Sequence, residues 1–380
     1  MRDNKQFSED GNEDKSSSLY CWWRSCATSE ELRNMKVTSL CDVAELTPRL
    51  KVMREMERLA LIASEGLDDL RCRLLAYRAG DLWVPIGGIN KEEMEMPSVN
   101  TILLVGFTGG GKSSLVNYMY SVLARAGVIP FAQTSGSSTN SEFTTMTLEE
   151  HNVLRSTKAG FCVYDSRGFR YEDPMDETLM ELSQWTNEGV QHNQLCYISG
   201  DDFGLGSTST ATRFVKRHVN CVMVVANMSF MYHCFKASDS SSLEATKLLF
   251  SYSALKTSNQ NPILILTHGD KLTAEERIDG RVKICQFLGI SETSGVYDIV
   301  CLTECGVLAE ESDPITAYAL TEAVYRALLI SDITHLPKQN FKDKLNYTVS
   351  WVLLVIASFC SFLARLFSGL SRKHRKLKSY

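Results

Sequence analysis

The sequence predicts an α/β fold with a doubly wound, mostly parallel sheet, preceded by a helical section and followed by a transmembrane helix. Two observations predict the sheet. Short apolar runs recur through the middle of the chain and are separated by segments long enough for crossover helices. A glycine-rich turn joins the first run to a segment of helical character. The expected strands are 101–105, 161–165, 220–226, 262–267 and a strand near 298–302.

Residues 1–97 precede the expected sheet and divide into two parts. Residues 1–29 begin as a polar, acidic stretch without the apolar core of a secretory signal, so we expect a disordered tail. Residues 30–97 are expected to form a helical hairpin. Its first helix would begin at Thr47-Pro48 and end at Gly66, and its second would end near Gly80. Such a hairpin could be an oligomerisation or effector element, or it could simply cover an edge or face of the sheet.

The turn after the first strand carries the pattern Gly106-x-x-x-x-Gly111-Lys112-Ser113, which is typical of a P-loop. A helix is expected over 114–126. Glycines allow the backbone to approach phosphate oxygens without a Cβ clash, and the helix N-terminus favours an anion. Lys112 would neutralise the β- and γ-phosphates, and the hydroxyl of Ser113 would ligate Mg²⁺.

The strand 161–165 ends in the pattern Asp165-x-x-Gly168. Asp165 could hold Mg²⁺ through water, and the Gly168 N–H could reach a γ-phosphate. The alternative for this short pattern is an ordinary β-turn.

The strand 262–267 is followed by His268, Gly269 and Asp270, where a parallel sheet binds its ligands. The Asp270 carboxylate could accept both the ring N–H and the exocyclic amine of guanine, a pair of donors that adenine lacks. The alternative is that Asp270 caps a helix.

With these three elements in this order, residues 98–332 resemble a GTPase domain of the translation-factor-related P-loop class. The residues from Lys112 onward are similar to the interferon-induced protein 44-like GTPases. The Thr-His pair after the strand and the C-terminal segment more distantly resemble the tail-anchored plastid import GTPases. The resemblance implies GTP or GDP and Mg²⁺ as ligands.

The resemblance also implies a switch threonine among Thr134, Thr139, Thr144 and Thr145, of which we favour Thr139, and a base-contacting loop at 303–306. The residues expected to act in hydrolysis are Lys112, Thr139 and Gly168, and the metal ligands are Ser113 and Asp165. The expected nucleotide-binding residues are Gly106, Phe107, Thr108, Gly109, Gly110, Gly111, Lys112, Ser113, Ser114, Thr267, His268, Asp270 and Thr303.

Phe169 stands where many regulatory GTPases carry a glutamine that orients the attacking water. We therefore expect slow, Mg-dependent GTP hydrolysis. Arg167 and Arg170 could supply charge within one chain or across a homo-oligomer, or they could be solvated surface residues. The alternatives to a GTPase are a GTP-binding scaffold with vestigial hydrolysis, or an ATPase if Asp270 does not read guanine.

The C-terminal part contains an uncharged run of twenty residues, 345–364, after a linker at 333–344. A helix of that length spans about 30 Å, the hydrocarbon thickness of a bilayer. Residues 365–380 are a basic tail. We expect a single-pass tail anchor with the nucleotide domain in the cytosol, in an organelle outer membrane or the endoplasmic reticulum. A buried core helix and an interfacial helix are the alternatives.

The composition excludes some other classes of function. A net charge of −5 does not favour nucleic acid as a partner. The twelve cysteines include no C-x-x-C pair, which indicates reduced thiols rather than a disulfide framework or a zinc site. Residues 198–212, rich in Gly, Ser, Thr and Asp, predict a mobile loop between two strands.

Overall fold

We describe a computed structural model of the chain, over residues 20–35, 46–85, 91–125, 131–132, 145–196, 214–257, 259–301, 313–335, 349–361 and 363. The chain divides into two compact units. One contains the described residues up to 84 and from 96 to 334, and the other contains those of 85–95 and 335–380.

The first unit is built on a seven-stranded sheet with the order β4-β2-β3-β1-β5-β6-β7. Strands β1, β3, β5, β6 and β7 are parallel, whereas β2 and β4 pair antiparallel at one edge. The strands are β1 (Asn100–Val105), β2 (Thr147–His151), β3 (Phe161–Asp165), β4 (Gln194–Leu195), β5 (Cys221–Asn227), β6 (Ile263–Thr267) and β7 (Val296–Asp298). The predicted mostly parallel sheet is therefore confirmed.

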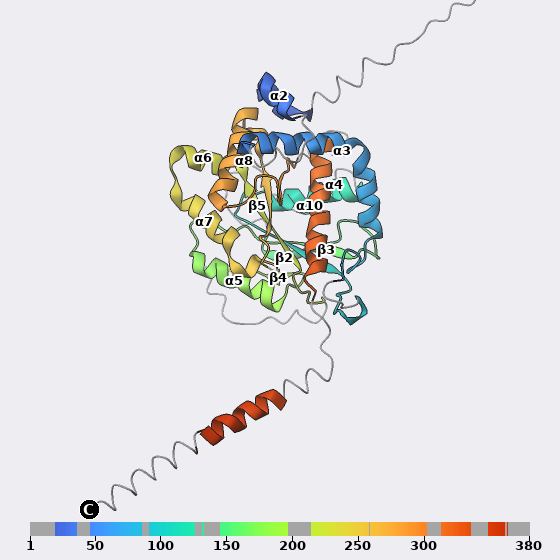
Figure 1. Cartoon of the computed structure of the whole chain (residues 1–380), viewed down its shortest axis with the longest axis vertical. Helices are drawn as coiled ribbons and strands as arrows, with labels where there is room; N and C mark the ends of the chain where they lie inside the picture. The colour runs from blue at the N-terminus through green and yellow to red at the C-terminus, as the bar shows by residue number, and fades with distance from the viewer. Residues whose placement is uncertain are drawn as a thin grey trace, which may run out of the picture. The chain divides into compact units, whose positions relative to one another are not determined.

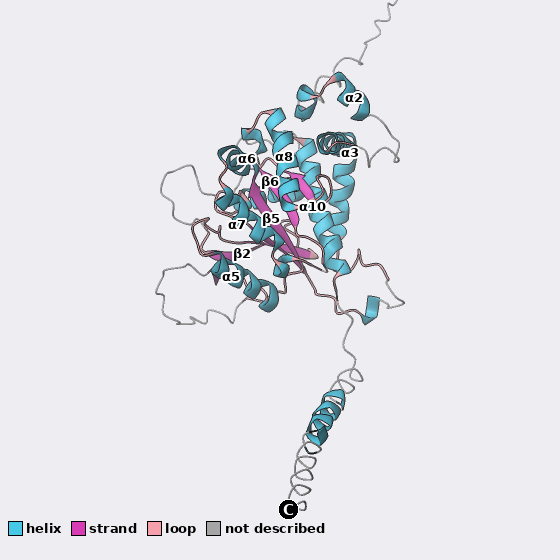
Figure 2. Cartoon of the chain, turned by 60° about the vertical axis from the view of Figure 1, so that its left-hand side comes forward, coloured by secondary structure: helices cyan, strands magenta, loops and turns pink. Residues whose placement is uncertain are grey.

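Helices cover both faces of this sheet (Figure 2). Ile102 and Leu104 of β1 belong to a core formed with α3, α4 and α10, whereas Leu103 and Val105 belong to a core formed with α5, α6 and α7. Because both faces are buried, the strands are apolar at successive positions. The helices are α3 (Pro48–Ala76), α4 (Lys112–Ala124), α5 (Met175–Glu188), α6 (Met228–Ala237), α7 (Ser240–Ser251), α8 (Ala274–Leu288) and α10 (Pro314–Ile333).

The predicted helical hairpin is wrong, because α3 is one helix of 29 residues that passes through Gly66. A Cβ on Gly66 would lie 2.8 Å from Ile62 Cγ2 and 3.0 Å from Tyr318 Cε2 of α10. Gly66 therefore lets α10 approach α3 closely. This packing outweighs the roughly 1 kcal/mol by which a glycine disfavours a helix. Figure 1 shows α3 running along the top of the unit and down one side.

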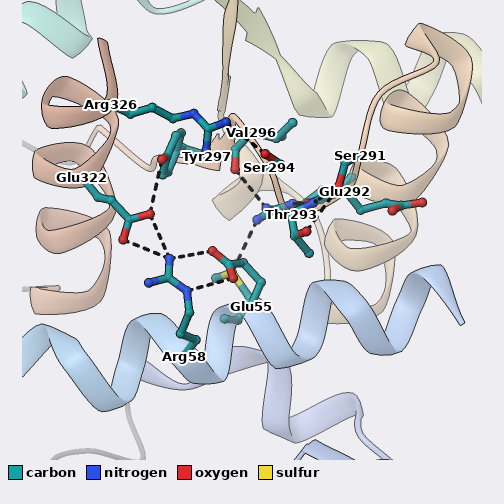
Figure 3. Close-up of polar contacts among 12 residues, drawn as sticks. Glu55, Arg58, Ser291, Glu292, Thr293, Ser294, Val296, Tyr297, Glu322 and Arg326 are labelled. Atoms are coloured by element: carbon teal, nitrogen blue, oxygen red, sulfur yellow. Dashed lines mark hydrogen bonds and ion pairs between the residues drawn. The ribbon is translucent and has the colours of Figure 1, made fainter. Parts of the chain in front are cut away.

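A polar network fixes α3 to α10 and to β7 (Figure 3). Arg58 of α3 pairs with Glu55 at 2.7 Å and with Glu322 of α10 at 2.9 Å. Tyr297 of β7 donates to Glu322 over 3.3 Å. The hydrogen bond to Glu55 and the two carboxylates raise the pKa of Arg58, although its burial opposes them. The α3 helix is thus an integral cover of the domain, as the second alternative for this region proposed.

The predicted tail at 1–29 is wrong for its last ten residues. Trp22–Cys26 form the 3-10 helix η1, and Ser29–Met35 form helix α2. The Trp23 side chain is fully buried and donates from Nε1 to Glu57 of α3 over 3.2 Å. The large apolar ring, together with its hydrogen bond, accounts for this order in a stretch of otherwise polar composition.

In the second unit, residues 349–361 form a helix within the predicted membrane segment 345–364. Among the residues that the structure describes, no helix is both long enough and apolar enough to span a bilayer.

Candidate functional site

The candidate site lies at the carboxyl edge of the parallel strands, where the loops after β1, β3 and β6 meet. The loop after β1 carries Lys112 and Ser113 at the start of α4, and β3 ends at Asp165. The loop after β6 begins at His268. β3 and β5 flank β1, and β6 adjoins β5, so segments distant in sequence lie next to one another.

Two glycines of the loop after β1 occupy positions that exclude a side chain. Gly111 precedes α4 with φ +87°, a left-handed conformation that favours glycine. A Cβ on Gly106 would lie 2.2 Å from the carbonyl oxygen of Val225. The loop is therefore packed tightly against β5, and the helix N-terminus behind it is shaped for an anion.

Lys112 is buried inside this loop. Its Nζ donates to the carbonyl oxygens of Gly106 and Phe107 over 3.0 and 3.4 Å. Burial lowers the pKa of Lys112 to about 8, although the charge of Asp165 opposes this shift. A buried cation that binds carbonyls of its own loop is well placed to bind an anion instead.

Ser113 and Asp165 are joined across the two loops, since Ser113 Oγ donates to Asp165 Oδ2 over 2.5 Å. Burial raises the pKa of Asp165 to about 6, although the charge of Lys112 and this hydrogen bond oppose the shift. The other oxygen, Oδ1, is buried and accepts no hydrogen bond from the described residues. A hydroxyl beside a buried carboxylate oxygen without a donor is a donor set that suits Mg²⁺.

The loop after β3 lies directly against the loop after β1. The Thr108 N–H donates to the Phe169 carbonyl over 2.8 Å, and the Phe169 N–H donates to the Gly106 carbonyl over 3.2 Å. A Cβ on Gly168 would lie 2.7 Å from Thr108 Cα. Because its aspartate binds Ser113, this segment is more than an isolated β-turn.

The side chain of Phe169 belongs to the core rather than to the site. It is fully buried and packs on Trp185, with ring centroids 6.0 Å apart. The Phe169 ring therefore presents no polar atom to the residues around Asp165.

The two arginines of this loop differ in their surroundings. Arg167 is not a solvated surface residue, because its side chain is buried and pairs with Glu181 at 2.9 Å. Arg170 is partly exposed and pairs with Asp173 at 2.9 Å. Arg167 is consequently held by carboxylates of its own chain, which weakens the idea that it acts across an interface.

Two residues that support the phosphate loop come from neighbouring strands. Thr267 Oγ1, at the end of β6, donates to the Gly110 carbonyl over 2.7 Å. Asn227 Nδ2, at the end of β5, donates to the Gly109 carbonyl over 3.2 Å. The sequence analysis named Thr267 but missed Asn227. Its position as a polar residue directly after an apolar strand was the available signal.

The segment after β6 presents Asp270 to solvent. Asp270 is exposed within the 3-10 helix η5 (Gly269–Lys271) and accepts no hydrogen bond from the residues described. The N-cap of α8 is Thr273, which forms a capping box with Glu276. The helix-cap alternative for Asp270 is therefore wrong, and its carboxylate is available to a ligand.

His268 joins this segment to the phosphate loop. Its φ is +58°, and its Nδ1 lies 2.9 Å from Thr267 Oγ1. Its Cε1 atom would lie 3.4 Å from a Cβ on Gly111. Burial lowers the pKa of His268, with a further contribution from Lys271. A largely neutral imidazole thus lies where the predicted phosphate and base regions meet.

The remaining predicted residues lie partly outside the described part of the chain. Ser114 lies in the first turn of α4, and Thr145 is buried just before β2. The candidates outside the described residues are Thr134, Thr139, Thr144, Thr303 with the loop 303–306, and the predicted mobile loop 198–212.

A cavity of about 300 Å³ is lined in part by residues 107–110 of the loop after β1. Phe107, Tyr171 and Phe230 line it and stack in sequence, with centroids 4.0 and 5.0 Å apart. Lys112, Ser113 and Asp165 are not among its lining residues. Because Lys112 and Ser113 lie outside this cavity, it is not the place where a nucleotide phosphate would meet them.

Comparisons with known proteins add little to this geometry. No protein-family model matches the chain, and no curated protein matches it. The chain is similar to a crystal structure of a probable GTP-binding protein engB, with a TM-score of 0.34 and 11% identity over 60% of this chain and 98% of that one. It is also similar to Toc33 from Arabidopsis thaliana in complex with GDP and Mg²⁺, with a TM-score of 0.33 and 13% identity over 63% of this chain and 88% of that one.

Proposed function

We propose that this chain binds GTP and GDP with Mg²⁺ and hydrolyses GTP slowly. One observation carries the proposal. The buried Lys112, the Ser113–Asp165 pair and the exposed carboxylate of Asp270 all lie at the carboxyl ends of strands, along the same edge of the sheet. A cation, a metal-binding pair and a base-reading carboxylate in this order match the parts of a P-loop GTPase.

In this proposal each residue has a separate task. Lys112 and the N-terminus of α4 would bind the β- and γ-phosphates, and Asp270 would accept hydrogen bonds from guanine. Ser113 and Asp165 would hold the metal. Mg²⁺ bound there would neutralise the negative charge of the phosphates.

Slow turnover follows from the residues beside Asp165. Phe169 is part of the core, and Arg167 is held by Glu181, so neither side chain serves water or the phosphates. These facts also favour the alternative of a GTP-binding scaffold with vestigial hydrolysis. Turnover measured over a range of protein concentrations distinguishes the two. A rate that rises with concentration indicates a homo-oligomer in which a partner supplies the missing group.

We further propose that residues 345–364 anchor the protein in a membrane as a single C-terminal span. The support is compositional, namely an uncharged run of twenty residues followed by a basic tail. The nucleotide domain would then face the cytosol, from an organelle outer membrane or the endoplasmic reticulum.

The deciding experiment is competition binding with GDP and ADP in the presence of Mg²⁺. We expect GDP to bind at least about tenfold more tightly, since the guanine edge adds hydrogen bonds to a charged acceptor. Asp270→Ala should remove this preference, whereas Asp279→Ala, on the exposed face of α8, should not. Equal binding of ADP and GDP by the wild type would overturn the guanine assignment and leave an ATPase as the function.

A further inference from the structure

The N-terminal aromatic segment packs over the region that supports the proposed base-reading loop. In η1, Trp22 and Trp23 meet edge to face, with centroids 5.8 Å apart. The guanidinium carbon of Arg277, in α8, lies 4.1 Å from the ring centroid of Trp22. A cation over an indole face at this distance is an attractive contact.

The same arginine forms a buried ion pair under the loop. Arg277 Nε donates to Asp298 Oδ2, at the end of β7, over 2.6 Å. Both side chains are more than nine-tenths buried. The second oxygen of Asp298 accepts no hydrogen bond from the described residues. A buried pair of this kind is rigid, because moving either partner leaves a charge without compensation.

The base-reading loop rests on this pair at Gly269, one residue before Asp270. A Cβ on Gly269 would lie 2.6 Å from Arg277 Nε and 2.9 Å from Asp298 Oδ1. The φ of Gly269 is not positive, so the backbone itself would accept alanine. The ion pair, and not the backbone conformation, is what requires glycine here.

The two residues that follow Trp22 are in turn attached to α3. Trp23 Nε1 and Arg24 Nε both donate to Glu57, over 3.2 and 3.1 Å. The helix α3 is fixed to α10 and β7 by the network of Arg58 and Glu322 (Figure 3). Successive contacts thus connect α3, through Trp22 and Arg277, to Gly269.

We propose that the N-terminal segment around Trp22 is a specificity-determining brace, which acts through the Arg277–Asp298 pair to position Asp270 for recognition of guanine. This inference rests on the proposed function. Arg277 and Trp22 are positioning residues in it, since neither touches the nucleotide. The aromatic cluster at the N-terminus, which no other part of the site explains, thereby acquires a role.

The test compares the dissociation constants of GDP and inosine diphosphate, which lacks the exocyclic amine of guanine. We expect the wild type to favour GDP by about tenfold or more, because Asp270 loses one hydrogen bond with inosine. Gly269→Ala should reduce this ratio at least about fivefold. Gly280→Ala is the matched control on α8, because a Cβ there meets only ordinary contacts at 3.4 Å or beyond. It should leave the ratio unchanged.

A second pair of variants tests the brace from its other end. Trp22→Leu removes the aromatic face and should lower the preference for GDP over inosine diphosphate. Trp22→Phe keeps an aromatic face for Arg277 and should retain the wild-type preference. Thermal unfolding of each nucleotide-free variant shows whether the fold is retained, and hydrogen exchange over 267–272 should rise in Trp22→Leu.

The outcomes separate the two proposals. A wild type that binds GDP and inosine diphosphate equally overturns guanine reading, and the brace with it. A wild type that discriminates, with Trp22→Leu and Gly269→Ala folded and equally discriminating, overturns the brace alone.

Discussion

Replacing Lys112 with methionine should strongly weaken nucleotide binding without destabilising the nucleotide-free protein. Burial lowers the pKa of Lys112 from 10.5 to about 8. At pH 7 the amine is protonated in both the folded and the unfolded chain, so this shift corresponds to about 3 kcal/mol against the folded state. Methionine fills similar space without charge. It forfeits the hydrogen bonds to Gly106 and Phe107, which together stabilise the fold by about 1–3 kcal/mol.

The charge of Lys112 also helps to keep Asp165 ionised. Without that charge, the Asp165 carboxyl, whose pKa is already about 6, takes up a proton near neutral pH. This protonation limits the cost of leaving it buried. The expected change in unfolding free energy therefore lies between zero and a gain of about 2 kcal/mol, a rise in Tm of a few degrees. The affinity for GDP should fall at least about a hundredfold, because the contacts of a cation with phosphate are lost.

Urea denaturation and isothermal titration with GDP measure the two effects on the same sample. The matched control is Lys216→Met, which removes a half-exposed amine 3.7 Å from Glu188 and should change neither quantity by more than about 0.5 kcal/mol. The reasoning fails if Lys112→Met loses more than about 1 kcal/mol of stability without nucleotide. It fails equally if that variant binds GDP as tightly as the wild type.

Three further predictions concern other parts of the chain. Burial, with a smaller contribution from His192, lowers the pKa of His151 to about 4, even though Glu149 lies 3.6 Å away. Between about pH 6.5 and 4 the unfolded chain binds this proton before the folded chain does. The wild type should therefore lose about 2–3 kcal/mol of unfolding free energy between pH 7 and 4.5, a loss that His151→Phe avoids, as urea denaturation at the two pH values would show. An equal loss in both proteins would refute the lowered pKa of His151. Phe169→Ala should cost about 3–5 kcal/mol in urea denaturation because it opens a cavity beside Trp185, and a loss below about 1 kcal/mol would place the ring outside the core. Deleting 345–380 should move the protein from a carbonate-resistant membrane pellet to the soluble fraction with unchanged GDP affinity, and a truncated chain that stays in the pellet would contradict the anchor.

The strands and the glycine-rich loop after β1 could be predicted because their signals are local. A parallel strand buried on both faces, such as 101–105, is a continuous apolar run, and the residues that follow each run meet at one edge of the sheet. The sequence predicted Lys112, Ser113 and Asp165 as site residues in this way, and the structure brings Ser113 and Asp165 into contact. The prediction that Asp270 could cap a helix was wrong, because Thr273, three residues later, is the N-cap of α8.

The errors arose where tertiary contacts outweigh local preference. A glycine such as Gly66 predicts the end of a helix, but the absence of a side chain here makes room for Tyr318, some 250 residues later in the sequence. The Arg277–Asp298 pair could not be foreseen, because nothing in the spacing of these residues shows that β7 ends beneath α8. Residues 1–18 are polar and predict disorder for the whole tail, but the buried ring of Trp23 and its hydrogen bond to Glu57 order the end of it.

The packing of α3 on α10 has a consequence for the synthesis of the chain. These helices end and begin at residues 76 and 314, so roughly 240 residues are made between them. Translation proceeds at about 5–20 residues per second, so α10 is made on the order of 12–48 s after α3. During this interval the surface of α3 at Gly66, which packs on Tyr318 in the finished domain, is not covered by α10. We therefore expect this side of α3 to stay exposed to solvent in the nascent chain until translation has passed residue 333.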